Sequence, residues 1–514
     1  MSSGVLLFLN SRRFPATLQG ASIPNGASIM AGFRIKSGWI AGIVFALLFV
    51  LLFALRLGLF HKDVPIGTPV GQQLSERETW MNIFQKGNKI GYAHRSFSRT
   101  DVGYHILESI LMRINTMGMI QDIRFKTEGY LNDDLTLASF NFELFSGLFH
   151  FRTRGVVNGR NLTIFTGNPD HERKFDISLK KIPHLGVGIV ETVWNFGLRE
   201  GQGKTFHVFD LVTMAERPVK VEVLGDETIV IMEKKVKAKK ISVNFMGADQ
   251  FAWLGEDGNV LKEEGILGIS LERVTKDEAA RGLHRLSGAD LIKIASIPSN
   301  ERIDNPDDLS KLKVMLYGIE DVPVFLDGGR QSLRDGVLTI RRESVSNLSR
   351  QFPDDVKMFL EPSPFIQSDH PMVKDMAKKI VSMDDPVIVK AKKLTAWVYE
   401  HVQKRPVISV PSAVDILRNL AGDCNEHAVL LAALARAAGI PAQVEMGIVY
   451  QGGRFYYHAW NVLYLGDWIT VDSVMGQIPA DVTHIRFVRG AAEHQIDLMG
   501  VIGKVTLEIV GQVR

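Results

Sequence analysis

The chain of 514 residues contains a single cysteine, Cys424. One cysteine excludes an intramolecular disulfide, and it excludes zinc sites that are built from several cysteines. The chain has no Walker-type loop and no convincing dinucleotide-binding glycine pattern, which argues against a phosphate-cradling site. The net charge is only +3, so charge gives no reason to expect a nucleic-acid partner. What remains is an ordinary globular composition, 46% hydrophobic and 23% charged, in a chain long enough for about two to four domains.

A long apolar run lies near the N-terminus. Residues 39–55 are all apolar or glycine, and Arg56 is the first charge after them. We predict a transmembrane signal anchor at residues 38–60; a cleaved signal peptide and a buried core helix are the alternatives. The basic residues before the run favour a cytoplasmic segment at 1–37, so we expect a single-pass inner-membrane protein whose C-terminal part is periplasmic or extracytoplasmic. Translation from Met30 would give a more economical signal anchor and is an alternative start.

Residues 64–295 have the pattern of an antiparallel β-rich domain. Phe140, Phe142 and Leu144 alternate with polar residues, which is the period of a half-buried strand. Asn158-Gly159 lies between two alternating runs and predicts a type I′ hairpin. The lysine-rich run at 234–240 is typical of a solvated strand face or of edge protection. Contact with anionic lipid or an acidic polymer is the lesser alternative. We interpret the region as a structural module, although a curved sheet could also cradle an apolar ligand.

The second half of the chain changes from strand to helix and back. A linker at 296–311 precedes a small β-containing segment at 312–365. From residue 369 to 514 we predict one domain, in which helices come first and antiparallel strands follow, so the expected fold class is α+β. The expected helices are 369–382, one that opens at Asp384-Asp385-Pro386, 412–420 and the helix after Gly422; the expected strands are 443–450, 455–464 and 468–473.

Cys424 lies at the predicted start of the last of these helices. Asp423 is a plausible N-cap, while Gly439 and Pro441 predict the C-terminal end. A cysteine in the first turn meets free backbone N–H groups and the helix dipole, which favour a thiolate and hence a nucleophile. A small buried hydrophobe is the alternative for a lone cysteine. A Cys-x-x-His metal pair with His427 is also conceivable, but the sequence offers no second pair of ligands.

His458 and Asp472 lie on two successive predicted strands. A two-residue turn at Gly466-Asp467 would put them on opposite faces of the hairpin. A three-residue loop, Leu465-Gly466-Asp467, would oppose residue 464 with 468 and make His458 a diagonal neighbour of Asp472 on the same face. An acyl-transfer site needs these groups, because histidine moves the proton of the thiol and the carboxylate fixes the imidazole tautomer. The catalytic interpretation therefore predicts a three-residue or bulged turn.

Three separated segments now agree in order, residue type and spacing. They are Gly422-Asp423-Cys424 with its alanine-rich helix, His458-Ala459-Trp460, and Trp468-x-x-x-Asp472. Over residues 370–490 the chain resembles the transglutaminase-like superfamily of papain-like cysteine enzymes. The resemblance implies Cys424 as nucleophile, His458 as general base and acid, and Asp472 as the orienting acid. It departs at Val462, where many members carry an acidic residue, and at Ser473, where proline is frequent.

The resemblance implies a cysteine enzyme that acts on amide bonds of a protein or peptide through a Cys424 thioester. Resolution by water would make it a peptidase or amidase, and resolution by an amine would make it a transglutaminase-type acyltransferase; we lean to hydrolysis. The Cys424 backbone N–H is the natural oxyanion donor, and Gln403 is a second candidate. We expect no cofactor, no metal and no nucleic-acid partner. The alternative is a non-catalytic peptide- or ligand-binding module in which the β-rich region does the binding.

Overall fold

The computed structural model describes residues 74–514, apart from 148, 168–171, 246, 283–288, 320–323, 346–351, 411 and 491–499. The predicted cytoplasmic segment at 1–37, the predicted anchor at 38–60 and the alternative start at Met30 lie outside the described residues. Within the described part, no helix is both long and apolar enough to span a bilayer. The transmembrane helix of the predicted fold class therefore has no counterpart among the described elements.

The N-terminal half forms one sheet of fifteen strands, in the order β8-β7-β6-β5-β4-β3-β2-β1-β15-β14-β13-β12-β11-β10-β9. Neighbouring strands pair antiparallel, except that β9 and β10 pair parallel. The strands are β1 Arg77–Gln85, β2 Asn88–Thr100, β3 Gly103–Thr116, β4 Met119–Leu131, β5 Leu137–Ser146, β6 Phe149–Asn158, β7 Asn161–Thr166, β8 Arg173–Ser178, β9 His184–Leu185, β10 Gly203–Asp210, β11 Ala215–Ile231, β12 Lys234–Phe245, β13 Ala248–Leu254, β14 Val260–Glu264 and β15 Ile269–Val274. Short helices accompany them: α2 Ile189–Asn195, α3 Lys276–Ala280 and α4 Leu291–Ala295.

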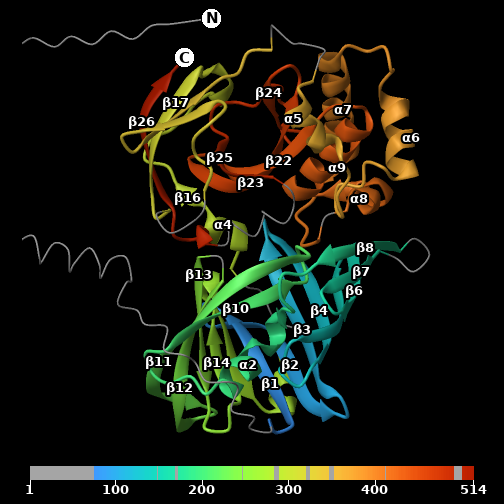
Figure 1. Cartoon of the computed structure of the whole chain (residues 1–514). Helices are drawn as coiled ribbons and strands as arrows, with labels where there is room; N and C mark the ends of the chain where they lie inside the picture. Colours follow the sequence, from blue (N-terminus) through green and yellow to red (C-terminus); the bar gives the residue numbers. More distant parts are fainter. Residues whose placement is uncertain are drawn as a thin grey trace, which may run out of the picture. The chain divides into compact units, whose positions relative to one another are not determined.

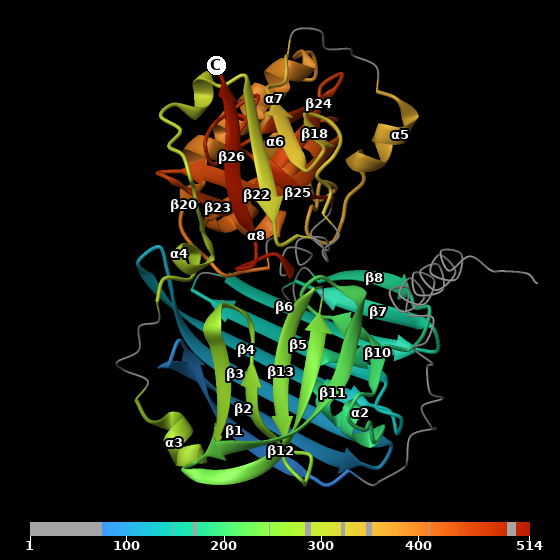
Figure 2. The ribbon, with the colours of Figure 1, turned by 90° about the vertical axis from the view of Figure 1, so that its left-hand side faces the viewer.

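The sheet curls so that strands distant in its order face one another. In Figure 2, β11 to β13 lie in front of β2 to β5. Phe140 on β5 packs against Phe209 on β10, with their ring centroids 5.7 Å apart. Phe140, Phe142 and Leu144 are all buried, as their alternation predicts, while Asn141 between them is exposed. The aromatic faces of successive hairpins thus supply the apolar core of this sheet.

The hairpin between β6 and β7 corrects a detail of the prediction. Asn158 pairs with Asn161, so the two turn residues are Gly159 and Arg160 rather than Asn158 and Gly159. Gly159 has a φ of 60°, but Arg160 has a negative φ, which a type I′ turn does not allow. Glycine at the first central position fixes the turn one residue later than the Asn-Gly signal suggests. The lysine-rich run is on β12, as predicted for a strand.

The described part of the C-terminal half combines five α-helices with two small sheets and the two-stranded ladder of β20 and β21 (Figure 1). A five-stranded sheet has the order β16-β23-β22-β25, with β24 paired to β23, and a four-stranded sheet has the order β18-β19-β17-β26. The strands are β16 Ile297–Pro298, β17 Lys311–Tyr317, β18 Gln331–Arg334, β19 Val337–Arg341, β20 Gln403–Lys404, β21 Ala421–Gly422, β22 Ala442–Gln451, β23 Arg454–Tyr464, β24 Trp468–Val471, β25 Ile485–Gly490 and β26 Thr506–Val513. The helices are the short α5 Asp354–Lys357 and then α6 Pro371–Ile380, α7 Val387–His401, α8 Ala413–Asn419 and α9 Cys424–Ala437.

Helix α9 is the centre of this half. It packs against α6, α7 and α8 and against β22 and β23, and Figure 1 shows it between the other helices and the sheet. Residues 428–435 are all buried, so the alanine-rich helix is enclosed by apolar neighbours. Small side chains allow this close packing from several directions, which explains the sequence composition.

The predicted α+β fold class is wrong for the described residues, because it underestimated the share of strand relative to helix. Strands dominate, because the fifteen-stranded sheet is continuous and because β17 to β19 join the C-terminal β26 in a further sheet. The helical cluster is confined to the part between residues 371 and 437. The sequence shows the period of each strand but carries no signal for which distant strands pair, so the extent of the sheets was underestimated.

Candidate active site

Cys424 is the first residue of α9, as predicted. Asp423 is its N-cap: its Oδ1 accepts a hydrogen bond from the Asn425 amide at 2.9 Å. The Asp423 amide in turn donates to Glu426 Oε2 at 2.8 Å, which completes a capping box. Gly422 is needed before the cap, because a Cβ there would overlap the side chain of Glu426. The turn thus fixes the position of the Cys424 backbone and side chain.

The helix is attached directly to the strand that carries His458. Asn461 on β23 donates from Nδ2 to the carbonyl of Ala428 at 2.8 Å. The backbone of Ala459, the residue after His458, lies within hydrogen-bonding reach of the Cys424 sulfur. The thiol therefore lies beside the strand at the position of His458 and Ala459. Two of the three predicted residues are brought together by this contact between helix and strand.

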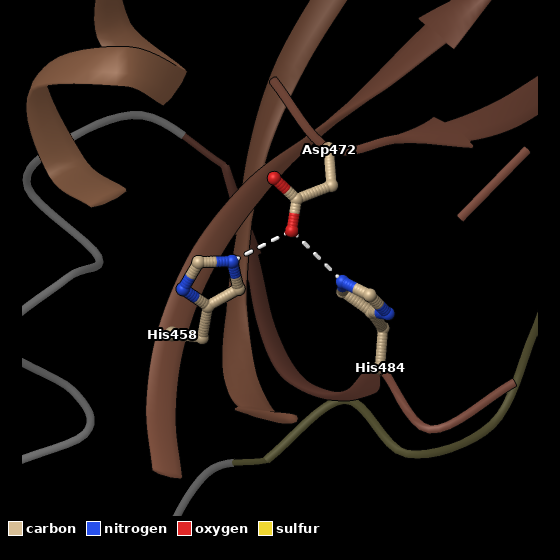
Figure 3. Close-up of side chains that lie close together, drawn as sticks. All are labelled: His458, Asp472 and His484. Carbon is tan, nitrogen blue, oxygen red and sulfur yellow. Dashed lines mark hydrogen bonds and ion pairs between the residues drawn. The ribbon is translucent and has the colours of Figure 1, made fainter. Parts of the chain in front are cut away.

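The hairpin between β23 and β24 has the register that the catalytic interpretation requires. Tyr464 pairs with Trp468 and Asn461 with Val471, which leaves the three-residue loop Leu465-Gly466-Asp467. Gly466 has a φ of 111°, a conformation that residues with a Cβ rarely adopt. The predicted register is confirmed. His458 Nε2 lies 2.7 Å from Asp472 Oδ2 (Figure 3), which leaves Nδ1 as the ring nitrogen not bound to Asp472.

A second histidine, which the sequence did not single out, also binds Asp472. His484 lies directly before β25 and is fully buried. Its Nε2 is 2.9 Å from the same oxygen, Asp472 Oδ2, so the carboxylate lies between two imidazoles (Figure 3). The other oxygen, Asp472 Oδ1, accepts the backbone amides of Val474 at 2.6 Å and Met475 at 2.9 Å. Both oxygens of Asp472 are thus fully engaged.

Burial and charge set the protonation states of the site. Burial alone would raise the pKa of Asp472, but His458 and His484 hold that pKa well below its usual range. Asp472 is therefore ionised at neutral pH. Burial would likewise lower the pKa of His484, yet its hydrogen bonds to Asp472 and Asp481 raise that pKa to about 9. His484 is a cation at neutral pH.

The thiol differs from the prediction. We predicted that the helix N-terminus would favour a thiolate at Cys424. Instead, burial raises the pKa of the Cys424 thiol, and the charges of Asp423 and Glu426 raise it further, against the opposing effect of the Ala459 backbone. Burial and the neighbouring Glu426 also raise the pKa of Asp423. Burial is thus the largest obstacle to a thiolate at Cys424, and the charge of Asp472 also raises the pKa of the thiol.

A buried network supports the other side of the histidines. The indole of Trp460 lies edge-on to the His484 ring, with centroids 5.2 Å apart, and donates to Glu445 Oε2 at 2.8 Å. Glu445 also pairs with Arg486 at 3.3 Å and Arg489 at 2.6 Å. This buried carboxylate is therefore compensated by two guanidinium groups and an indole N–H, which is the condition for keeping a charge in a protein interior.

Gln403 and His427, which the sequence also singled out, both lie near the start of α9. Gln403 pairs with Ala421 in the short parallel ladder of β20 and β21, directly before the cap of α9; its side chain is exposed, and its role as oxyanion donor stays a prediction. His427 faces its own helix start, with Nδ1 2.7 Å from the Asp423 carbonyl oxygen, and burial lowers its pKa. The backbone of Val402, outside α9, also lies within hydrogen-bonding reach of the His427 ring.

His458, Asp472 and His484 also have the spacing of a metal-binding group, since one donor atom of each lies within 4.8 Å of the others. The two imidazoles, however, meet on one carboxylate oxygen at hydrogen-bond distances of 2.7 and 2.9 Å. Protons between the rings and the shared oxygen account for this arrangement, so we interpret it as a hydrogen-bonded chain.

The fold and site define a papain-like arrangement, with a cysteine at a helix N-terminus against a strand that carries a histidine paired to an aspartate. Residues 374–473 match the model of the transglutaminase-like superfamily, and the chain carries a domain of that superfamily. No curated protein sequence matches the chain.

Several solved structures are similar to parts of the chain. One is a β-barrel-like protein of unknown function from Brucella abortus, with 10% identity over 40% of this chain and 98% of that one and a TM-score of 0.33. Another is a candidate cysteine protease from Cytophaga hutchinsonii. It has 19% identity over 39% of this chain and 81% of that one, and a TM-score of 0.26. A third is the periplasmic domain of TgpA from Pseudomonas aeruginosa bound to ethylmercury. It has 14% identity over 54% of this chain and 86% of that one, and a TM-score of 0.21.

Proposed function

We propose that the protein is a cysteine enzyme that opens amide bonds of a protein or peptide through a thioester on Cys424. In this proposal His458 is the general base and acid, and Asp472 orients its ring. The observation that carries the proposal is the placement of the Cys424 sulfur beside Ala459, next to a histidine whose Nε2 is bound to a buried carboxylate. Asp472 holds the Nε2–H tautomer, which leaves the lone pair of Nδ1 free to accept a proton.

The raised pKa of the thiol shapes the first step. A neutral thiol gives up its proton to His458 Nδ1 as the sulfur attacks the amide carbon, so thiolate formation and attack are coupled. The backbone N–H of Cys424, at the open end of α9, can donate to the carbonyl oxygen as it becomes negative. His458 then passes its proton to the amine, the C–N bond breaks, and the acyl group remains on sulfur.

The second step returns the enzyme to its starting state. Water attacks the thioester, His458 accepts a proton from it, and the C–S bond breaks as the proton returns to the sulfur. The product is then a carboxylic acid, and the enzyme is a peptidase or amidase. If a primary amine attacks instead, the product is a new amide. We favour hydrolysis and keep acyl transfer as the alternative outcome at the same site.

An electrophilic peptide probe tests the proposal. Because Cys424 is the only thiol of the chain, mass spectrometry of the intact protein reports modification of this residue alone. We expect labelling near neutral pH that is lost in Cys424→Ala and slowed at least tenfold in His458→Ala. Amide turnover should disappear in Cys424→Ala while circular dichroism and the melting temperature stay unchanged. A thiol that is inert in the folded protein, or turnover that persists in Cys424→Ala, would refute the enzyme and favour a non-catalytic binding module.

Substrates decide between the two outcomes of the thioester. Incorporation of a fluorescent primary amine into an acceptor protein would indicate acyl transfer, and release of free amine and acid without incorporation would indicate hydrolysis. The extracytoplasmic location also stays a prediction, because it rests on residues outside the described part. Reporter fusions after residue 74, one active only in the cytoplasm and one only outside it, would test the location directly.

A further inference from the structure

His484 lies behind the catalytic pair in a fully enclosed position. Its Nε2 faces Asp472 Oδ2 at 2.9 Å. Its Nδ1 faces the backbone oxygen of Asp481 at 3.3 Å and Asp481 Oδ1 at 3.4 Å. Asp481 is itself held in place, since its Oδ1 accepts the amide of Thr483 at 2.7 Å and its Oδ2 accepts Nε2 of Gln477 at 3.0 Å. Both ring nitrogens of His484 therefore face acceptors.

An imidazole that faces acceptors with both nitrogens must donate from both, and only the imidazolium can do so. The raised pKa of His484, about 9, agrees with this geometry. Three charged or titratable groups surround the ring: the carboxylates of Asp472 and Asp481 at its two nitrogens, and the His458 ring with its centroid 5.9 Å away. Arg330 binds the backbone oxygen of His484 at 2.9 Å.

The remaining charges near His484 are already paired. Arg330 pairs with Glu343 at 3.2 Å, and beyond the Trp460 indole Glu445 pairs with Arg486 and Arg489. These pairs leave the two aspartates and His458 as the groups with which the His484 charge interacts directly. The buried His484 cation is therefore separated from the His458 ring by a single carboxylate, that of Asp472.

We propose that His484 is a positioning residue of the active site: as a buried imidazolium clamped between Asp472 and Asp481, it fixes the Asp472 carboxylate and places a positive charge behind the pair that moves the proton of Cys424. This inference rests on the proposed function, since it concerns the proton transfer from Cys424. His484 touches neither the sulfur nor a substrate in this role. It acts through the oxygen that it shares with His458.

The sign of the effect follows from Coulomb's law. A positive charge on His484 favours a negative charge on Cys424. Loss of the His484 charge therefore makes the thiol hold its proton to higher pH. With an effective dielectric constant of about 20, a unit charge about 6 to 12 Å away corresponds to about one to two pH units, and we expect a shift of this size.

Alkylation of the full chain with iodoacetamide across the pH range measures this effect without a known substrate. Wild type and His484→Gln are compared, with Cys424→Ala as the blank. Glutamine keeps one N–H donor toward Asp472 but removes the charge. His184→Gln is the matched control, because His184 on β9 binds a single backbone oxygen, that of Leu135 at 3.0 Å. We expect the acidic limb of the rate profile to move to higher pH by about one to two units in His484→Gln and to stay unchanged in His184→Gln.

A purely structural role for His484 predicts a different result. His484→Gln would then lower the rate by the same factor at every pH, or leave it unchanged, and either outcome overturns the proposal. If His484→Gln does not fold, nitrogen-15 NMR of histidine-labelled wild type decides. At pH 8 a histidine with the ordinary pKa of about 6.5 is neutral, so we expect the signals of one buried imidazolium; their absence also overturns the proposal.

The two levels of inference fail in distinguishable ways. If His458→Ala has no effect on the alkylation of Cys424, the proposed enzyme fails, whatever His484 does. If His458→Ala slows alkylation while His484→Gln leaves the pH profile in place, the enzyme stands and the role of His484 is refuted.

Discussion

The carboxylate of Asp472 accepts four hydrogen bonds, two from histidines and two from backbone amides. In Asp472→Asn the amide oxygen can keep the two backbone partners, Val474 and Met475. The NH₂ group must then face the Nε2 atoms of both histidines. Because a donor cannot face a donor, His458 must present the lone pair of Nε2 and carry its proton on Nδ1. That tautomer has no lone pair left to take the proton of Cys424.

The cost of this substitution has two parts. The wrong histidine tautomer in a serine protease triad lowers kcat by about 10⁴, and we expect a fall of about 10³- to 10⁴-fold in kcat/KM here. The substitution also leaves the buried His484 without one of its two carboxylates. Removal of one partner of a buried ion pair destabilises a protein by about 3–5 kcal/mol. We expect a loss of unfolding free energy near the lower end of that range, because His484 can revert to its neutral form in the variant.

Two measurements separate these parts. Amide turnover and probe labelling report the tautomer, and urea unfolding at several pH values reports the stability. Wild-type Asp472 has a depressed pKa, so its stabilising contribution is present above the unfolded pKa of about 4 and is lost as pH falls below it. The difference in unfolding free energy between wild type and variant should thus be constant from about pH 5 to 6.5 and shrink below about pH 4.

Asp467→Asn is the matched control, since Asp467 is an exposed residue of the adjoining loop whose Oδ1 accepts the Trp468 amide at 2.7 Å. We expect it to retain turnover and stability close to wild type. Turnover of Asp472→Asn within tenfold of wild type, in protein whose unfolding transition is intact, would refute the assignment of Asp472 as the group that fixes the tautomer.

Three further predictions concern the charges around the site. The pKa of His484 is raised from 6.5 to about 9, so the stability that its charge provides is fully present below pH 6.5 and is lost as pH rises to about 9. In urea titrations over this window, wild type should lose up to about 3 kcal/mol of unfolding free energy and His484→Gln should not. The double variant Asp423→Asn with Glu426→Gln should move the pH dependence of Cys424 alkylation to lower pH by about one unit, because the charges of both groups raise the pKa of the thiol; an unchanged profile in folded protein would contradict this effect. Gly422→Ala should cost about 1–3 kcal/mol and slow probe labelling, because its Cβ overlaps Glu426, and a melting temperature equal to wild type would contradict the tight cap.

Local features of the catalytic half could be predicted because each rests on neighbouring residues. The four helices α6 to α9 begin and end within a few residues of the predicted positions, since caps, prolines and the apolar period all lie in the local sequence. The catalytic interpretation required His458 and Asp472 on one face of the β23–β24 hairpin. Parity turned that requirement into a three-residue loop at 465–467, which is the loop that the structure has.

Long-range pairing could not be predicted in the same way. The alternation of Phe140 and Phe142 indicates a strand and its buried face, but nothing in it indicates that Phe140 packs on Phe209 across a curled sheet. The pairing of β17 with β26 joins segments about 190 residues apart in sequence (Met315 with Glu508), and neither strand carries a signal for its partner. For the same reason the α+β class underestimated the share of strand.

His484 and the state of the thiol show why side-chain chemistry is harder to predict than elements. A histidine before a strand has no sequence feature that marks it as a ligand of Asp472, because a loop of 11 residues returns the chain to that oxygen. The thiolate prediction counted the helix dipole and omitted Asp423 and Glu426, although both stand in the same turn. The cap that positions Cys424 is built from carboxyl groups, so the features that fix the nucleophile in place also oppose its ionisation. Burial is the largest cause of the raised pKa of the thiol, and the charges of Asp423, Glu426 and Asp472 add to it. The sequence shows these acidic groups but not the enclosure of the sulfur, which only the folded chain creates.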